Sequence, residues 1–209
     1  MNYFIFSSAT ILLLFFLSLH TTTAANPAVL DIDGHPVRPN SPYYILPVVR
    51  GRGGGLTVEP KNITELCPLA AAQETRELNN GIPLKLHSVN PKDKRVFVST
   101  DLNIVFDAVP LCVPSGPSFI WQLAIDEETG RRYVGFGGQI GNPGVETVSN
   151  WFKIEKAGSG TYDYKIVFCP SVCNFCKVMC GDIGVFVDND GRRLLDLNDQ
   201  PLLVNFKKA

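Results

Sequence analysis

Six cysteines constrain the possible folds of this chain more than any other feature. Cys67 and Cys112 stand apart, and the other four follow one another at spacings of four, three and four residues: Cys169, Cys173, Cys176 and Cys180. The cluster lacks the two C-x2-C pairs, separated by a longer insert, that are typical of a structural zinc site. Its central Cys-Asn-Phe-Cys has the spacing of a redox pair, but no βαβ pattern surrounds it. The interpretation that we favour is nested disulfides, with Cys169 bonded to Cys180, Cys173 to Cys176, and Cys67 to Cys112.

The first residues of the chain predict a secretory leader. Residues 11–19 are almost wholly apolar, and small residues follow up to Ala24 and Ala25. Such a run is too short to span a bilayer, and signal peptidases cut after small residues of this kind. We therefore expect a signal peptide over residues 1–25 and one domain over residues 26–209, secreted to the extracellular space or delivered to the vacuole. No Lys or Arg precedes the apolar run, which leaves an uncleaved anchor as the alternative. In an exported chain, an even number of cysteines favours disulfides over free thiols.

Short segments rich in Val, Ile, Tyr and Phe recur between Gly, Pro, Asn and Asp along the rest of the chain, without a helical period. They predict strands over residues 43–49, 96–99, 103–106, 118–124, 133–136, 151–155, 162–168, 184–187 and 194–197. Four dipeptides can supply the positive φ of tight turns: Asp33-Gly34, Asn80-Gly81, Thr129-Gly130 and Asp190-Gly191. The pattern is typical of an all-β sandwich or barrel, with residues 206–208 as a frayed end.

The charged residues argue against two classes of partner. Lys and Arg total 19 and Asp and Glu 20, which gives a formal net charge of −1, and the signs are interspersed. Such a balance offers no complementary face to nucleic acid or to an anionic membrane surface. After residue 25 no apolar stretch is long enough for a further membrane pass. We expect no nucleic acid, membrane, metal or cofactor partner.

Motifs for catalysis and for sugar binding are missing. His35 and His87 are the histidines after residue 25, and neither a Gly-x-Ser-x-Gly nor a His-Glu-x-x-His motif occurs. Residues 51–55 lack the Lys and Ser/Thr of a phosphate loop, and residues 188–191 lack the Gly and Glu positions of a calcium loop, so we predict turns at both places. No Gln-x-Trp triplet occurs, and we place Trp121 and Trp151 in the core. These patterns predict neither an enzyme nor a ricin-type lectin.

Several motifs resemble the plant Kunitz-type (soybean trypsin inhibitor) family. Residues 29–37 read Val-Leu-Asp-Ile-Asp-Gly-His-Pro-Val, and residues 43–47 read Tyr-Tyr-Ile-Leu-Pro. The resemblance extends from there to the end of the chain, and residues 167–177, with their clustered cysteines, are similar to the miraculin-like branch. It implies a β-trefoil, a six-stranded barrel capped by three hairpins, with the nested disulfides as the branch's pattern. It also implies inhibition of serine endopeptidases, in defence or stress response.

The resemblance places an inhibitory loop between the two cysteines of the first disulfide, over residues 88–97. Lys92, Asp93, Lys94 and Arg95 are its expected contact residues, because a long basic side chain can enter the specificity pocket of a trypsin-like protease. Lys94, or a residue next to it, is the expected primary specificity residue. The asparagine that braces this loop in active members falls near Pro39, with Asn40 one position away.

Other functions stay open at this point. A loop that has lost its inhibitory geometry would leave a trefoil that inhibits cysteine or aspartic proteases, binds carbohydrate or serves for storage. We expect a monomer, because Ala157 stands where a covalently dimeric member of the branch has a cysteine. Asn62 begins a glycosylation sequon, Asn-Ile-Thr.

Overall fold

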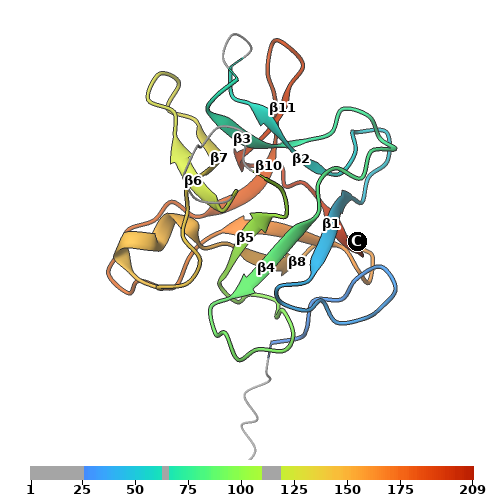
Figure 1. The fold of residues 1–209 in the computed structure, drawn as a ribbon, viewed down its shortest axis with the longest axis vertical. Coiled ribbons are helices and arrows are strands. Elements are labelled where there is room, and N and C mark those ends of the chain that lie inside the picture. The colour runs from blue at the N-terminus through green and yellow to red at the C-terminus, as the bar shows by residue number, and fades with distance from the viewer. Residues whose placement is uncertain (1–25, 63–65, 110–118) are drawn as a thin grey trace, which may run out of the picture.

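Alternating apolar residues build the core of this all-β chain, whose computed structural model describes residues 26–62, 66–109 and 119–209 (Figure 1). The strands are β1 (Pro42–Pro47), β2 (Leu56–Pro60), β3 (Leu69–Gln73), β4 (Leu84–Ser88), β5 (Leu102–Phe106), β6 (Trp121–Ile125), β7 (Arg132–Phe136), β8 (Lys153–Lys156), β9 (Tyr164–Phe168), β10 (Gly181–Val187), β11 (Arg193–Asn198) and β12 (Val204–Lys208). A short 3-10 helix, η1 (Val145–Asn150), precedes β8. In these residues no helix has the length and apolar character to cross a membrane.

Six strands close into a barrel. β1 pairs with β4 and β12, β4 with β5, and β9 with β8 and β12, all antiparallel. A bridge between Leu102 and Phe152 closes the ring between β5 and the residue just before β8. Every second side chain of these strands points inward and is buried, as a period of two requires: Tyr43, Ile45, Leu84, Leu86, Leu102, Ile104, Ile154, Tyr164, Ile166, Val204 and Phe206.

Three hairpins, β2–β3, β6–β7 and β10–β11, cover one end of this barrel (Figure 1). They also contact one another, because β11 pairs with β3 at Leu194 and Ala72 and with β7 at Asp196 and Tyr133. A six-stranded barrel capped by three hairpins is a β-trefoil, as expected from the family resemblance. We call this the capped end, and we call the opposite end, where β4 ends and β5 begins, the open end.

Side chains tie the three hairpins into a closed triangle. Lys61, just after β2, forms an ion pair with Asp126, just after β6. Arg131, just before β7, donates to the fully buried Asp196 of β11 at 2.8 Å between Nη1 and Oδ2. Arg192, just before β11, donates to the carbonyl oxygen of Lys61 at 2.7 Å. Each hairpin is therefore held by both of its neighbours.

The chain differs from the sequence prediction in three ways. β2, β3 and β4 were not predicted, because β3 is largely alanine and the other two are short and polar on one face. The predicted strand over residues 96–99 is wrong: Phe97 forms one bridge with Ala28, and the backbone then turns through Ser99 at φ 59°. The predicted frayed end is also wrong, since residues 206–208 belong to β12 and pair with β1.

The predicted turns and core tryptophans are confirmed. The glycines of all four turn dipeptides have positive φ, between 69° and 84°. Residues 51–55 form a close-packed turn, in which a Cβ on Gly55 would lie 2.0 Å from the carbonyl oxygen of Asn80. Trp121 and Trp151 are fully buried.

Candidate inhibitory loop

Loop 88–97, the segment expected to contact a protease, leaves β4 at the open end of the barrel and lies at the edge of the molecule opposite the hairpins (Figure 1). Lys92, Lys94 and Arg95 are exposed, whereas Asp93 is half-buried. The structure therefore separates the four predicted contact residues into three free basic side chains and one acidic side chain that is engaged within the loop.

Asn90 shapes the first half of the loop. Its carbonyl oxygen accepts from the backbone N–H of Asp93 at 3.1 Å, which closes a turn with Pro91 at its second position. Its side chain accepts from the N–H of Lys92 at 3.2 Å and donates to the Asp93 carboxylate at 2.7 Å. Asp93 thus acts as a brace inside the turn, and the backbone leaves the turn directly at Lys94.

The second half of the loop is held from both sides by the N-terminal segment. Val96 donates its N–H to the carbonyl of Val37 at 2.9 Å, and its carbonyl accepts from the N–H of Val29 at 2.8 Å. Two residues later, Val98 donates to the carbonyl of Pro27 at 2.9 Å. Val96 and Val98 are also buried, so the chain is fixed immediately after Arg95.

The base of the loop is closed by one backbone hydrogen bond, from the N–H of Val89 to the carbonyl of Asp101 at 2.9 Å. Asn40, one position from where active members of the family have a bracing asparagine, does not brace the loop. Asn40 is exposed, and its side chain has no hydrogen bond to a residue that the structure describes; its backbone N–H donates to Leu86. Asn90 has the bracing role instead, and its position before Pro91 is the sequence signal that indicates it.

An open groove runs along one side of the loop. Lys94 and Arg95 line it together with Arg38, Lys208 and the signature residues Asp31 and His35. Asp31 is buried and accepts the backbone N–H groups of Asp33 and His35 at 3.1 and 2.8 Å. Ligand atoms of Asp31, Asp33 and His35 approach within 4.8 Å of one another, which is a spacing that a metal ion could use. Asp31 already accepts two backbone N–H groups, so the closeness of these three side chains is explained by the turn between Val29 and Val37.

His87 lies at the base of the loop on the other side. It lines a second cleft with Asn90 and Pro91. Burial, and then the positive charge of Lys85, lower the pKa of His87 below its usual value. The imidazole of His87 is therefore uncharged at neutral pH.

The clustered cysteines form the nested pairs Cys169 with Cys180 and Cys173 with Cys176. Cys67 is disulfide-bonded, and its expected partner, Cys112, lies outside the described residues. Asn62, the first residue of the sequon, is exposed, whereas Ile63 and Thr64 lie outside the described residues.

Comparison with known proteins agrees with this geometry. Residues 29–208 match the legume Kunitz family, described as trypsin and protease inhibitors. Miraculin of Synsepalum dulcificum is 47% identical over 209 aligned residues, which cover 93% of this chain and 94% of miraculin. Kunitz trypsin inhibitor 5 of Arabidopsis thaliana is 49% identical over 190 residues, which cover 90% of this chain and 89% of that protein. A solved Kunitz-type cysteine protease inhibitor from potato has a TM-score of 0.73 at 30% identity and covers 88% of this chain and 98% of its own.

The match extends over both the barrel and the three hairpins, and two of these three proteins are named as protease inhibitors. The trefoil topology, the signature turn at Asp31 and the exposed basic loop all lie within the matched residues. The chain therefore belongs to the Kunitz family of plant trypsin and protease inhibitors.

Proposed function

We propose that this chain inhibits trypsin-like serine endopeptidases, with Lys94 as the primary specificity residue and Arg95 as the next residue across the bond presented to the protease. One observation carries the proposal: both side chains are exposed directly before Val96, where the backbone is hydrogen-bonded on both sides. An extended ammonium at this point can reach the buried carboxylate of a trypsin-type pocket.

A loop of this kind inhibits because it is ordered before the protease arrives. Fixing mobile residues on association costs free energy, so a loop that already has its bound shape binds more tightly. Here the turn at Asn90 restrains one side of Lys94, and the hydrogen bonds of Val96 restrain the other. If the bond after Lys94 is cut, both new ends stay attached to the protein, which favours rejoining over release.

We also propose that the protein acts as a secreted monomer. Its disulfides support an oxidising compartment, because such bonds form and persist outside the cytosol. Ala157 offers no thiol for the interchain bridge that a covalently dimeric member of the branch forms at this position. N-terminal sequencing of protein recovered from culture medium, followed by light scattering, tests both statements.

The test of inhibition is a titration of the purified domain, residues 26–209, against trypsin, chymotrypsin, subtilisin, papain and pepsin. We expect stoichiometric inhibition of trypsin and much weaker inhibition of the others. Mass spectrometry of the complex after long incubation should show a single slow cleavage, at the bond between Lys94 and Arg95.

Two results would contradict the proposal. One is a trypsin inhibition constant no tighter than that of an unrelated protein. The other is rapid cleavage at several bonds within loop 88–97, which would show that the loop is an ordinary substrate. Inhibition of papain or pepsin alone would instead show that the target is a cysteine or an aspartic protease.

A further inference from the structure

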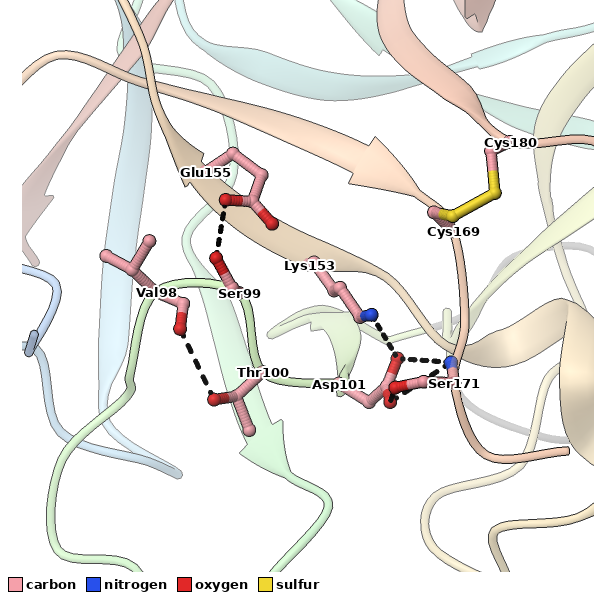
Figure 2. A network of polar contacts seen from close by, with 9 residues as sticks. All are labelled: Val98, Ser99, Thr100, Asp101, Lys153, Glu155, Cys169, Ser171 and Cys180. Carbon is pink, nitrogen blue, oxygen red and sulfur yellow. Dashed lines mark hydrogen bonds and ion pairs between the residues drawn. A yellow bond between two sulfur atoms is a disulfide. The ribbon is translucent and has the colours of Figure 1, made fainter. Parts of the chain in front are cut away.

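A buried carboxylate lies directly behind the inhibitory loop. Asp101, which immediately precedes β5, is 6% exposed. Ser171 donates to this carboxylate from its hydroxyl at 2.5 Å and from its backbone N–H, which is shared between the two oxygens at 3.2 Å each (Figure 2). Lys153 of β8 supplies the countercharge at 3.9 Å. A buried carboxylate is stable only with partners of this kind, so the position of Asp101 depends on Ser171 and Lys153.

The backbone of Asp101 closes the base of loop 88–97. Its carbonyl accepts the N–H of Val89 at 2.9 Å, so it ties the start of the loop to the segment that follows the loop. On either side of Asp101, Ser99 and Leu102 are hydrogen-bonded to the backbone of Ile154 and Phe152 at 2.9 Å. A displacement of Asp101 would therefore move the base of the loop relative to the barrel.

Ser171 belongs to a rigid ring, which we call the disulfide loop, residues 169–180. It lies two residues after Cys169, whose disulfide to Cys180 closes the ring, and the disulfide between Cys173 and Cys176 lies inside it. Figure 2 shows Ser171 directed at the Asp101 carboxylate, beside the bond between Cys169 and Cys180. The two segments are 70 residues apart in the chain.

We propose that Asp101 is a positioning residue for inhibition, because it couples the disulfide loop through Ser171 to the base of loop 88–97. The disulfide loop has no protease-facing role in this scheme. It supplies a hydroxyl and an N–H, both from Ser171, whose position the disulfides fix. These two groups hold the carboxylate of Asp101 in place, and the carbonyl of Asp101 in turn holds the N–H of Val89. The inference rests on the proposed inhibition of trypsin-like proteases for its functional readout.

The experiment compares Asp101→Asn, Ser171→Ala and Ser171→Thr in the folded domain. Asp101→Asn removes the charge but keeps the backbone carbonyl, and we expect the trypsin inhibition constant to rise about tenfold, which equals about 1.4 kcal/mol. Ser171→Ala removes only the hydroxyl and should raise the trypsin inhibition constant about threefold. Ser171→Thr keeps the hydroxyl and should restore the wild-type constant. The double variant, Asp101→Asn with Ser171→Ala, should be no weaker than Asp101→Asn alone, because both changes break one connection.

Two further readouts separate positioning from general stability. Hydrogen exchange of residues 89–95 and the rate of cleavage after Lys94 should both increase in Asp101→Asn and Ser171→Ala. Exchange of the core strands in Ser171→Ala should stay at the wild-type rate. Asp107→Asn is the matched control, because Asp107 lies just past the other end of β5 in a surface pair with Lys85 and should change none of these values.

The outcomes are distinct. Wild-type inhibition and wild-type exchange of residues 89–95 in both Asp101→Asn and Ser171→Ala would overturn the coupling. If the wild-type protein inhibits no protease, the proposed function fails, and hydrogen exchange alone decides the coupling: faster exchange in the two variants supports it, and unchanged exchange overturns it. If Asp101→Asn does not fold, Ser171→Ala and Ser171→Thr give the same decision.

Discussion

The two ends of the barrel are stabilised in different ways. At the capped end, charged side chains join one hairpin to the next, through two pairs of opposite charge and a hydrogen bond from Arg192 to a carbonyl, and Asp196 is fully buried under Arg131. At the open end, backbone groups of the N-terminal segment hold loop 88–97, while Lys94 and Arg95 have no hydrogen bond or ion pair to a residue that the structure describes. At the tip of the open end, unlike the capped end, the basic side chains Lys94 and Arg95 are therefore left available for a partner.

This difference indicates that stability and recognition are separable in this molecule. A side chain that holds a hairpin can be removed with a cost in folding free energy and no change at the loop. A basic side chain of the loop can be removed with a loss of binding and no change in the fold. The predictions below test that separation with variants at one end or the other.

The largest effect should come from the double variant Lys94→Ala with Arg95→Ala. It removes the charge expected in the protease pocket, and central contacts of this kind are worth about 4 kcal/mol or more, or roughly a thousandfold in the inhibition constant. The free energy of unfolding should change by less than about 0.5 kcal/mol, because both side chains are exposed. Inhibition kinetics with trypsin and urea unfolding measure the two quantities.

Arg50→Ala is the matched control for that variant. Arg50 is also exposed and basic, but it follows β1 at its end toward the hairpins. Its removal should leave trypsin inhibition unchanged. A double variant that still inhibits within tenfold of the wild type would show that loop 88–97 is not the contact surface.

Arg131→Ala should give the opposite result at the capped end. Among the described residues it leaves the buried Asp196 with only the amide of Asn198 as a side-chain partner, at 3.0 Å, and it removes the guanidinium packed 3.8 Å from the Phe186 ring centre. An unpaired buried charge costs about 3 kcal/mol, which should appear in urea unfolding. Trypsin inhibition should stay within twofold of the wild type.

The neighbouring Arg132→Ala is the control for this change. Arg132 is the first residue of β7, next to Arg131, and has no ion pair to a described residue, so its loss should cost less than about 1 kcal/mol. A parallel loss of stability and inhibition in Arg131→Ala would show that the two ends are coupled, against the separation argued above.

Asn90→Ala should produce a smaller effect, confined to the open end. It removes the acceptor of the Lys92 N–H and the donor to Asp93, and each such bond is worth about 1 kcal/mol or less on an exposed turn. We expect the trypsin inhibition constant to rise about fivefold and cleavage after Lys94 to become faster. Asn174→Ala, an exposed asparagine of the disulfide loop, should do neither. Unchanged inhibition in Asn90→Ala would mean that the brace has no role in binding.

Local patterns predicted an all-β chain, whereas the trefoil and the choice of loop 88–97 as the contact segment came from the family resemblance. Alternating apolar residues, Gly turns and the segment around Asp31 are readable in short windows of sequence. β3 could not be predicted, because its alanines have low strand propensity. They are ordered by pairing with β2 and β11 on either side. Its conformation is set by tertiary contacts.

The parts of the site that position the loop could not be predicted from sequence. Asp101 reads as a polar residue before a strand, and its partner Ser171 lies 70 residues further on. The same holds for the triangle of hairpin contacts, where Arg131 and Asp196 are 65 residues apart. Nothing in either local segment specifies such a pair. Asn90 is different, because the dipeptide Asn90-Pro91 is a local turn signal that indicates a brace within the loop itself.

The smallest predicted effect concerns pH at the capped end. The ion pair with Lys61, together with hydrogen bonds from Thr129, holds the pKa of Asp126 well below its usual range. A carboxyl whose pKa is lower in the folded state stabilises the fold fully above its unfolded pKa, about 4, and loses that contribution as the pH falls below it. The difference in unfolding free energy between wild type and Asp126→Asn should therefore be largest near pH 7, about 1 kcal/mol for a single half-buried pair that solvent still reaches, and should shrink steadily toward pH 2. Glu127→Gln, which changes an exposed neighbouring acid, should show no such trend. A difference that stays constant from pH 7 to pH 2 would mean that Lys61 and Asp126 do not hold the hairpins together through charge, and that the capped end depends on Arg131 and Arg192 instead.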